Sequence, residues 1–443
     1  MKSFSCSRQR FQTSRRLLAA LPLMKRRCQV KTLLLVVLLS VCAYASGPSV
    51  KTLYAFPANG QSGAEPSGNL IFDTQGNLYG VAALGGPNGA LGGVVFELTP
   101  NANSWTEQTL YAFPGGTDGQ TPVSGLIMDT AGNLYGTTEG GGNGNNGTVY
   151  ELSPNGLGGW NEQIIYAFTG GDDGATPYAS LVMDSSGNLY GTTQGGGSDS
   201  KGTVFQLSPN GDSWMFTTLY AFTGTQNSDG ATPSAGMVFD AQGNLYGTTI
   251  SGGRTNNGTV FELSPMGGGI WTEQVLLSFP NNPGKVKGPA SVPVFDTQGN
   301  MYVTLYNGGI QCPTTGDCGA VAELKNNGGV WSSSYIHQFN LTDNPKDGAF
   351  PYAGVVLDSA GNLCGTTQYG GNYGKGTAYR LSLKNGFWGE ADYSFCTAKG
   401  SCPTGSVPSG SLLLDSQGNV YGTALGGGLG PAPGNGTVFE IIP

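Results

Sequence analysis

The sequence predicts an all-β fold, a seven-bladed β-propeller of four-stranded antiparallel blades whose last blade is closed by the N-terminal strand. Three observations support this fold. The motif Asp-x-x-Gly-Asn followed by Leu, Met or Val returns seven times in 443 residues, at intervals of 55 to 62 residues. Each copy holds short β-like segments and shows no helical periodicity. A segment typical of the end of a repeat also stands before the first complete copy.

Two further residues recur in every copy. The motif glycines are Gly76, Gly132, Gly187, Gly243, Gly299, Gly361 and Gly418. An aspartate lies three positions before each of them, at Asp73, Asp129, Asp184, Asp240, Asp296, Asp358 and Asp415. A proline lies seven positions before each aspartate, at Pro66, Pro122, Pro177, Pro233, Pro289, Pro351 and Pro408. A fixed period of this length is typical of propellers and solenoids, in which each unit buries its apolar faces against its neighbours.

The second copy shows the strands that we expect in each blade, named A to D from the axis outwards. They are predicted over residues 124–129, 133–138, 147–152 and 160–168. The A–B turn contains Gly132, which can take a positive φ. Asp129 is expected to accept hydrogen bonds from the backbone amides of that turn.

The two ends of the repeat array indicate a closed ring. The last repeat stops after a strand C, Gly436–Ile441. The missing strand D has its counterpart near the N-terminus, where residues 52–56 precede the first repeat proline and match Leu-Tyr-Ala-Phe. We therefore expect this segment to pair as the outer strand of the seventh blade, which removes exposed sheet edges.

The first 45 residues are predicted to be a signal peptide, followed by a single propeller domain over residues 46–443. A basic flank precedes an apolar run, residues 33–41, and an A-x-A cleavage site, residues 43–45. The run is too short to span a bilayer. Met24 is an alternative start that gives a signal of ordinary length.

Two other export signals compete with this interpretation. Arg15-Arg16 is compatible with a twin-arginine signal, and Cys42 with a lipoprotein anchor, although Val41 stands where a small residue is expected. In all three cases the protein is exported, and none requires membrane insertion of the propeller.

Composition excludes some classes of partner. Residues 46–443 carry 11 basic and 28 acidic side chains, and hence a formal net charge of −17. Such a surface argues against nucleic acid or anionic membrane as a partner. The expected partner is an extracellular glycan or protein, and the expected state is a monomer.

Five cysteines lie in residues 46–443. Cys312 with Cys318, and Cys396 with Cys402, form two C-x5-C pairs in turn-rich insertions, so two local disulfides are predicted. Zinc is the alternative, but no histidine lies near them and the pairs fall in different repeats. Cys364 stands where six other copies have Tyr and is predicted to be a free, buried thiol.

The repeats resemble the bacterial tandem-repeat family called GloVer. The shared pattern is Leu-Tyr-x-Phe, x-Asp-Gly-x-x-Pro, Asp-x-x-Gly-Asn-Leu-Tyr-Gly-Thr-Thr, Gly-Gly-Gly and Gly-Thr-Val-Phe-Glu-Leu, which residues 108–153 carry whole. The resemblance implies a secreted or cell-surface protein and no particular activity. The fifth copy departs from the pattern, with Val303-Thr304-Leu305 in place of Gly-Thr-Thr.

Loop lengths indicate which face of the ring binds. The B–C and D–A loops vary in length whereas the A–B turns do not, and binding residues usually lie on variable loops. On this rim an aspartate precedes a glycine in four D–A loops, at Asp118, Asp173, Asp229 and Asp347. These are the candidate ligand-binding residues, as oxygen ligands for calcium or a sugar. The alternative is a purely structural turn residue before glycine.

No catalytic set is evident, and no cofactor other than calcium is suggested. The only histidine, His337, lies in a strand D, which argues against a Ser-His-Asp triad. The glutamates recur from repeat to repeat, as scaffold residues do. The hypothesis is therefore a non-enzymatic, secreted binding propeller. The alternatives are a glycosidase or polysaccharide lyase that uses rim carboxylates, and a structural surface-layer component.

Overall fold

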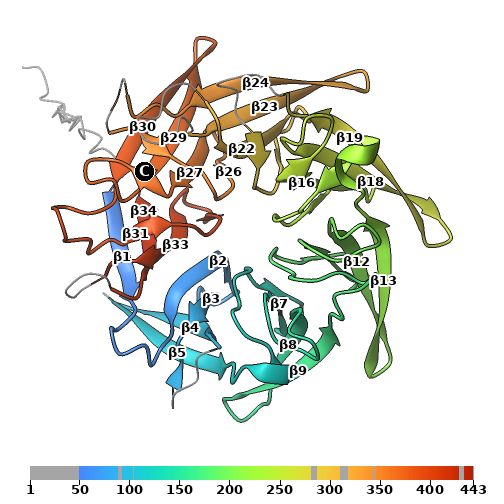
Figure 1. Cartoon of the computed structure of the whole chain (residues 1–443). Coiled ribbons are helices and arrows are strands. Elements are labelled where there is room, and N and C mark those ends of the chain that lie inside the picture. The colour runs from blue at the N-terminus through green and yellow to red at the C-terminus, as the bar shows by residue number, and fades with distance from the viewer. Residues whose placement is uncertain are drawn as a thin grey trace, which may run out of the picture. The chain divides into compact units, whose positions relative to one another are not determined.

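The computed structural model describes residues 49–87, 92–102, 104–280, 287–309, 318–342, 344, 346–428 and 434–442. All described strands belong to one compact unit, Ser46–Pro443, in which seven antiparallel blades surround a central axis (Figure 1). The predicted fold class is confirmed. The predicted signal peptide, residues 1–45, lies outside the described residues.

The strands of the first four blades follow one another in sequence order from the axis outwards. Blade 1 consists of β2 (Ala64–Phe72), β3 (Leu78–Leu84), β4 (Val94–Asn101) and β5 (Ser104–Ala112). Blade 2 consists of β6 (Ile127–Met128), β7 (Leu134–Thr138), β8 (Thr148–Pro154) and β9 (Trp160–Ala167). Blade 3 consists of β10 (Val182–Met183), β11 (Leu189–Thr193), β12 (Thr203–Asn210) and β13 (Ser213–Ala221). Blade 4 consists of β15 (Val238–Phe239), β16 (Leu245–Thr249), β18 (Thr259–Gly267) and β19 (Ile270–Ser278).

The other three blades keep this order, and two of them have a divided inner strand. Blade 5 consists of β20 (Lys287–Pro289), β21 (Val294–Phe295), β22 (Met301–Asn307), β23 (Ala320–Asn327) and β24 (Val330–Gln338). Blade 6 consists of β26 (Val356–Leu357), β27 (Leu363–Thr367), β29 (Thr377–Lys384) and β30 (Phe387–Ser394). Blade 7 consists of β31 (Ser406–Pro408), β32 (Leu413–Leu414), β33 (Val420–Gly426), β34 (Thr437–Ile442) and β1 (Ser49–Ala55).

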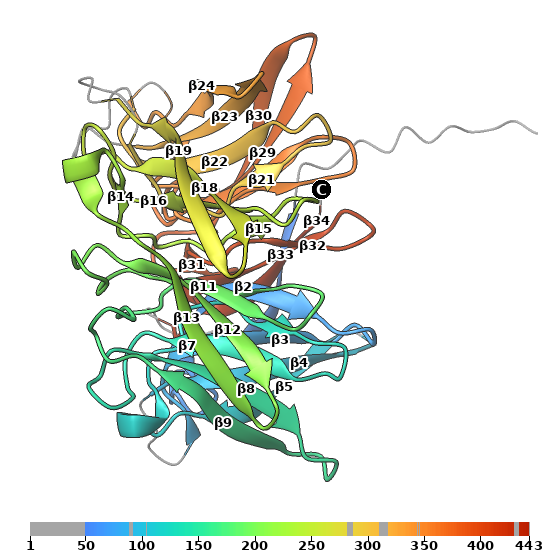
Figure 2. The ribbon, with the colours of Figure 1, turned by 90° about the vertical axis from the view of Figure 1, so that its right-hand side faces the viewer.

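Short elements in the loops join the D–A and B–C segments on one face of the ring. They are η2 (Gly116–Asp118), η3 (Gly224–Asn227), β14 (Gly230–Ala231), β17 (Ser251–Gly252), β25 (Gly348–Ala349) and β28 (Tyr369–Gly370). β14 pairs with β17, and β25 pairs with β28. The two sets of variable loops therefore share one rim, as predicted. In the side view of Figure 2 the ring is seen edge-on.

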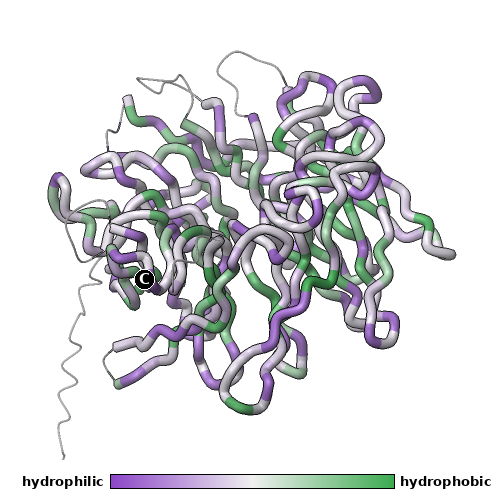
Figure 3. The backbone as a smooth tube through the Cα atoms, turned by 60° about the horizontal axis from the view of Figure 1, so that its bottom comes forward, coloured by the Kyte–Doolittle hydropathy of each residue, from purple (hydrophilic) through white to green (hydrophobic). Residues whose placement is uncertain are grey.

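The core is divided among the blade interfaces. Figure 3 shows hydrophobic stretches along the strands and hydrophilic stretches in the connecting loops. Strand B is buried along its length, because each sheet is covered on both faces by its neighbours. Seven separate clusters of buried side chains result, each shared by adjacent blades, rather than one central core.

Strand A is shorter than predicted in blade 2, where β6 covers only Ile127–Met128. Closer to the axis, this segment forms hydrogen bonds to side chains instead of a regular backbone ladder. The backbone amide of Thr137 donates to the Ser124 hydroxyl over 3.2 Å, and the amide of Gly125 donates to Ser180 Oγ of blade 3 over 2.9 Å. Small residues beside the axis thus replace the regular strand ladder with links between blades.

The N-terminal strand closes the ring, as predicted. β1 pairs antiparallel with β34, from Ser49 opposite Ile442 to Ala55 opposite Thr437, and Figure 1 shows β1 beside the last strands of the chain. One further link repeats at all seven interfaces: the residue before each repeat proline donates its amide to the carbonyl that precedes strand C of the previous blade. At the closure this is Glu65 to Asn435, over 2.9 Å, and between blades 1 and 2 it is Thr121 to Gly92, over 2.7 Å.

The repeated aspartates are turn caps, as predicted. Asp129 Oδ1 accepts from the amides of Ala131 and Asn133, and Oδ2 accepts from Asn133 Nδ2 and the Tyr135 hydroxyl. The sixth copy has Cys364 in place of the tyrosine. There Arg380 lies 2.7 Å from Asp358 and takes over the role of the missing hydroxyl.

The repeated Gly-Thr-Val and Pro residues belong to one contact between blades. A side chain on the glycine before strand C would collide with the ring of the next blade's proline; at Gly147 the Cβ would stand 2.4 Å from Pro177 Cδ. The same clash occurs at the closure, between Gly436 and Pro66, at 2.3 Å. Close packing of successive blades therefore requires this pair at every interface.

The departure of the fifth copy is a compensated exchange. In blade 4, a Cβ on Gly247 of strand B would meet Phe261 Cζ of strand C at 2.5 Å. In blade 5 the same paired positions hold Val303 and Ala322, both fully buried. A larger residue on strand B is thus accommodated by a smaller one on strand C.

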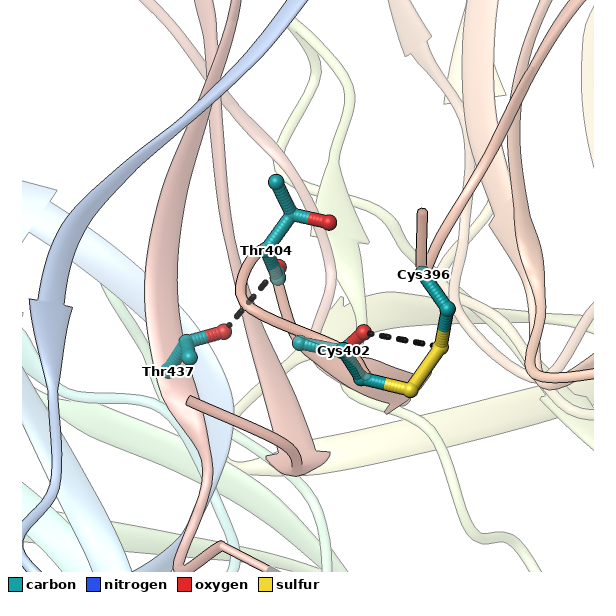
Figure 4. Close-up of a disulfide and its surroundings, with 5 residues drawn as sticks. Cys396, Cys402, Thr404 and Thr437 are labelled. Carbon is teal, nitrogen blue, oxygen red and sulfur yellow. Dashed lines mark hydrogen bonds between the residues drawn. A yellow bond between two sulfur atoms is a disulfide. The ribbon is translucent and has the colours of Figure 1, made fainter. Parts of the chain in front are cut away.

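One of the predicted disulfides is confirmed in full. Cys396 and Cys402 are bonded in the D–A loop before blade 7, close to the hydrogen bond from Thr437 to the Thr404 carbonyl (Figure 4). Cys318 is disulfide-bonded, but its predicted partner, Cys312, lies outside the described residues. Cys364 is a buried free thiol, as predicted.

Candidate functional site

A pocket of about 450 Å³ occupies the axis of the ring. Its wall is formed by the second residue after each repeat proline, which is small in every blade: Gly68, Ser124, Ala179, Ala235, Ser291, Ala353 and Gly410. The pocket extends to the rim of the B–C and D–A loops, since the first residues of several B–C loops also line it. We call this space the channel pocket.

The first residue after each repeat proline also lines the channel pocket, and here the blades differ. Five copies have Ser, Val or Ala, whereas blades 3 and 6 have Tyr178 and Tyr352. These blades are three apart in a ring of seven, so the two side chains approach from nearly opposite sides. Burial and the hydrogen-bonded Tyr178 hydroxyl raise the pKa of Tyr352 well above its ordinary range.

A third tyrosine extends this group along the wall. Tyr306, near the end of β22 in blade 5, packs against Tyr352 with ring centroids 5.5 Å apart and nearly perpendicular planes. The Tyr306 hydroxyl lies 3.4 Å from Gln368 Oε1. Both side chains are partly exposed, so they present ring faces and polar atoms to whatever enters the pocket.

Two carboxylates complete the lining. Glu139 begins the blade 2 B–C loop, and its charge is one of the influences on Tyr352. Glu65 is the second residue of β2 in blade 1 and is exposed. We call the set of Glu139, Tyr178, Tyr306, Tyr352 and Gln368 the channel mouth.

The four predicted aspartates lie elsewhere, and none of them lines the channel pocket. Each belongs to a different blade interface and faces the strand D before it. Tyrosine hydroxyls donate to three of them: Tyr111 to Asp118 (2.6 Å), Tyr166 to Asp173 (3.0 Å) and Tyr220 to Asp229 (2.9 Å). The structure therefore does not bring the four together around one ligand, and calcium binding by this set stays a prediction.

Asp173 accepts three hydrogen bonds, from the Tyr166 hydroxyl and from the backbone amide and hydroxyl of Thr169. Burial alone would raise its pKa, but donors from Thr169 and Tyr166 outweigh burial and hold the pKa of Asp173 below its ordinary value. In strand D of the next blade, the position that holds a glutamate in several other blades is occupied here by Phe216. Its ring stacks on Tyr166 with ring centroids 4.1 Å apart.

At two other interfaces a glutamate from the next blade joins the aspartate. Burial and the neighbouring Asp118 raise the pKa of Glu162 to about 7. Burial and Asp229 raise the pKa of Glu273 to about 8. A proton is therefore retained near neutral pH where two carboxyl groups share a buried position.

His337 takes the tyrosine position at the interface of blades 5 and 6. Its Nε2 lies 3.1 Å from Glu390 Oε1 and 3.7 Å from Asp347 Oδ1. Burial acts to lower the pKa of His337, but Asp347 and Glu390 outweigh it and raise that pKa to about 9. Burial and Glu390 raise the pKa of Asp392, in the same group, to about 8. The prediction of a packed, non-catalytic strand residue did not include these acidic neighbours.

The channel mouth was not predicted from the sequence. The candidate ligand-binding residues were sought among residues that recur from repeat to repeat, and the channel mouth consists of residues that do not recur. The available signal was a repeat position at which the copies disagree. Tyr178 and Tyr352 directly follow a repeat proline, where the other copies have small or branched residues. A side chain that breaks a small-residue pattern beside a ring axis marks a change in the lining of the channel.

Among the residues that the structure describes, no helix is long and apolar enough to cross a membrane.

Comparison with known proteins adds information about the fold. No curated protein matches the sequence. A proposed 6-phosphogluconolactonase from Bacteroides uniformis is similar in structure, with TM-score 0.49, 15% identity, and coverage of 73% of this chain and 84% of that one.

Two solved structures of the extracellular domain of one B. thetaiotaomicron protein, described once as a hybrid two-component system and once as a one-component system, are also similar. The extracellular domain of a proposed hybrid two-component system gives TM-score 0.54 and 10% identity, covering 88% of this chain and 39% of that one. The extracellular domain of a proposed one-component system gives TM-score 0.50 and 13% identity, covering 88% and 42%. This chain thus spans less than half of either, and at such identities the likeness concerns the fold alone.

Sequence comparison is decisive for the family. The Gloeobacter/Verrucomicrobia repeat matches residues 41–182, 157–311 and 236–443, and so extends over all seven blades. Together with the seven-fold recurrence of the aspartate-capped turn and the Gly–Pro contact between blades, this shows that the chain belongs to the family of Gloeobacter/Verrucomicrobia repeat proteins.

Proposed function

We propose that this protein is exported and binds a carbohydrate chain at the channel mouth, as a binding module rather than an enzyme. The observation that carries the proposal is the non-repeated group of Tyr178, Tyr306 and Tyr352 on the wall of an open pocket. These three tyrosines interrupt an otherwise regular repeat, and they lie toward the rim on which the loops vary in length.

The chemistry of this group suits a sugar. The C–H faces of a pyranose ring pack on aromatic rings, and tyrosine offers such a face with little conformational entropy to lose. Sugar hydroxyls need partners of both kinds, which tyrosine hydroxyls and the Gln368 amide supply. The carboxylate of Glu139 adds a strong acceptor. The rest of the wall mixes small apolar residues with serines, so it offers surface to the C–H faces and the hydroxyls of a sugar alike.

Export is supported by two features of the sequence and one of the structure. Residues 1–45 combine a basic flank, an apolar run and an A-x-A site. The Cys396–Cys402 disulfide suits an oxidising compartment. Fractionation of the host cell should place the protein outside the cytoplasm; recovery of uncleaved chain in the cytoplasm would contradict export.

Binding is tested with residues 46–443 against an oligosaccharide array, followed by calorimetry on the best ligand. Tyr178→Ser and Tyr352→Ser each restore the serine that other copies carry, so the scaffold tolerates them. Each should weaken binding by about tenfold or more, which corresponds to about 1.4 kcal/mol. The matched control is Phe387→Ser, because Phe387 is 80% exposed at the start of β30, directly after the C–D turn of blade 6 and on the opposite face. Equal affinity in all three variants would refute the site.

A specific observation keeps the enzymatic alternative testable. Glu65 and Glu139 come from different blades and line the same pocket, and paired carboxylates are the requirement for glycoside hydrolysis. Release of sugar from a bound polysaccharide that is lost in Glu139→Gln or Glu65→Gln, with binding intact, would favour the enzyme. Binding without release supports the proposal above.

A further inference from the structure

The acidic group around His337 has a composition that no other blade interface shares. His337 lies in β24, Asp347 directly precedes β25, and Glu390 and Asp392 lie in β30 of the next blade. The side chains of the first three are 18%, 6% and 16% exposed. Their donor atoms all lie within 4.8 Å of one another, and among the described residues this is the one group of three or more such side chains so arranged.

Two sister interfaces show what the repeat normally places here. Blades 1 and 2 meet at Tyr111, Asp118 and Glu162, and blades 3 and 4 meet at Tyr220, Asp229 and Glu273. A phenol donates one hydrogen bond and is a poor ligand while it keeps its proton. An imidazole nitrogen carries a lone pair for a metal ion. Replacing the tyrosine by His337 therefore changes a hydrogen-bonded position into a ligating one.

A further carboxylate enters the group through a change in β30. In five other blades strand D contains a register shift, and the residue opposite the central residue of strand C is Thr109, Ile164, Thr218, Val275 or Tyr335. β30 pairs with β29 without that shift and places Asp392 opposite Tyr379. Asp392 is hydrogen-bonded to Glu390 and feels the charges of Asp347 and His337.

The charges of this group do not balance. Three carboxyl groups surround one imidazole in a mostly buried position, so acidic groups outnumber the single basic group that could balance them. Burying uncompensated charge is costly. Nε2 of His337 and Oε1 of Glu390 are buried and lie 3.1 Å apart, and neither atom makes a hydrogen bond of regular geometry to a described residue.

The spacing fits a small divalent ion. Zinc binds nitrogen and carboxylate oxygen at about 2.0–2.2 Å, which places the ligand atoms of a tetrahedral site about 3.3–3.6 Å apart. The observed separations from His337 Nε2 are 3.1 Å to Glu390 and 3.7 Å to Asp347. We propose that His337, Asp347 and Glu390, with Asp392 beside them, bind a divalent transition-metal ion of the Zn²⁺ type that joins blade 5 to blade 6.

The chain offers its own control variants. His337→Tyr restores the tyrosine of the sister interfaces and Glu390→Gln removes a ligand without changing shape, whereas Glu273→Gln makes the same change at an interface without histidine. Residues 46–443 are prepared without a histidine tag, stripped with chelator and titrated with Zn²⁺ by calorimetry. Because His337 is the only histidine, its imidazole NMR signal reports the site without ambiguity.

The expected result is one equivalent of Zn²⁺ bound by the wild type, with a shifted imidazole signal and a higher Tm. Glu273→Gln should bind equally well. Glu390→Gln should bind at least tenfold more weakly, and His337→Tyr should show no saturable binding while keeping the circular dichroism spectrum of the wild type. A Co²⁺ complex of the wild type should show visible d–d bands that His337→Tyr lacks.

Two outcomes would overturn the proposal. One is the absence of saturable binding to a folded wild-type chain, which would leave His337 as an imidazolium paired with its carboxylates. The other is equal binding in the wild type and His337→Tyr, which would place the ion elsewhere.

Discussion

The exchange of Gly–Phe for Val–Ala between strands B and C gives a quantitative test of how the blades pack. Gly247→Val in blade 4 forces a branched side chain against Phe261, whose ring would stand 2.5 Å from the new Cβ. Overpacking of this kind costs about 1–3 kcal/mol. Phe261→Ala leaves a cavity in a fully buried position and costs about 3–5 kcal/mol.

The double variant recreates the pair that blade 5 uses, Val303 with Ala322. Valine then occupies part of the cavity, and the clash is gone. We expect the double variant to be less destabilised than the sum of the single variants, with a coupling of about 1–3 kcal/mol. The assay is urea unfolding of residues 46–443, with free energies from linear extrapolation and a check that the slopes agree. Losses that add to within about 0.5 kcal/mol would refute the idea that the two positions determine each other.

Three other predictions concern pH, ring closure and the disulfide. The pKa of Glu273 is raised to about 8, above the ordinary value of the unfolded chain, so the folded state is favoured by protonation and loses stability as pH rises from about 4.5 to about 8. Glu273→Gln should therefore raise stability by about 1–2 kcal/mol at pH 9, after allowance for partial exposure, and change little at pH 4.5; a Tm gain that does not depend on pH would contradict this. Phe56→Ala in the N-terminal segment should cost as much as Phe113→Ala in blade 1, about 3–5 kcal/mol, because the two rings are 3% and 0% exposed; a cost below about 0.5 kcal/mol for Phe56 alone would mean an open ring. Removing the disulfide in Cys396→Ser/Cys402→Ser should lower stability by about 2 kcal/mol, as expected for so short a loop, and an unchanged unfolding midpoint would contradict that estimate.

The fold could be predicted because the repeat carries its own structural reasons. Asp129 and its six counterparts cap a turn, and the glycine before strand C leaves room for the next blade's proline. Both are local requirements of a sheet packed between two others, so they recur in sequence at the period of the blades. The seventh blade is divided between the two ends of the chain, and this followed from counting how often each strand type occurs.

The site could not be predicted in the same way, because it depends on which side chains meet across the axis. Tyr178 and Tyr352 are 174 positions apart in sequence and come together only through the geometry of the ring. Three of the four aspartates predicted as rim ligands instead accept a hydrogen bond from a tyrosine of the preceding strand D, as Asp118 does from Tyr111. His337 appeared isolated because its acidic neighbours come from a loop and from the next blade.

The central claim is tested most directly by a crystal structure of residues 46–443 with the oligosaccharide that binds most tightly. The account predicts sugar density in the channel mouth, with a pyranose ring packed against Tyr306 or Tyr352 and hydroxyls bonded to Tyr178 and Gln368. Well-defined sugar on the opposite face, or between blades with the channel mouth empty, would contradict it.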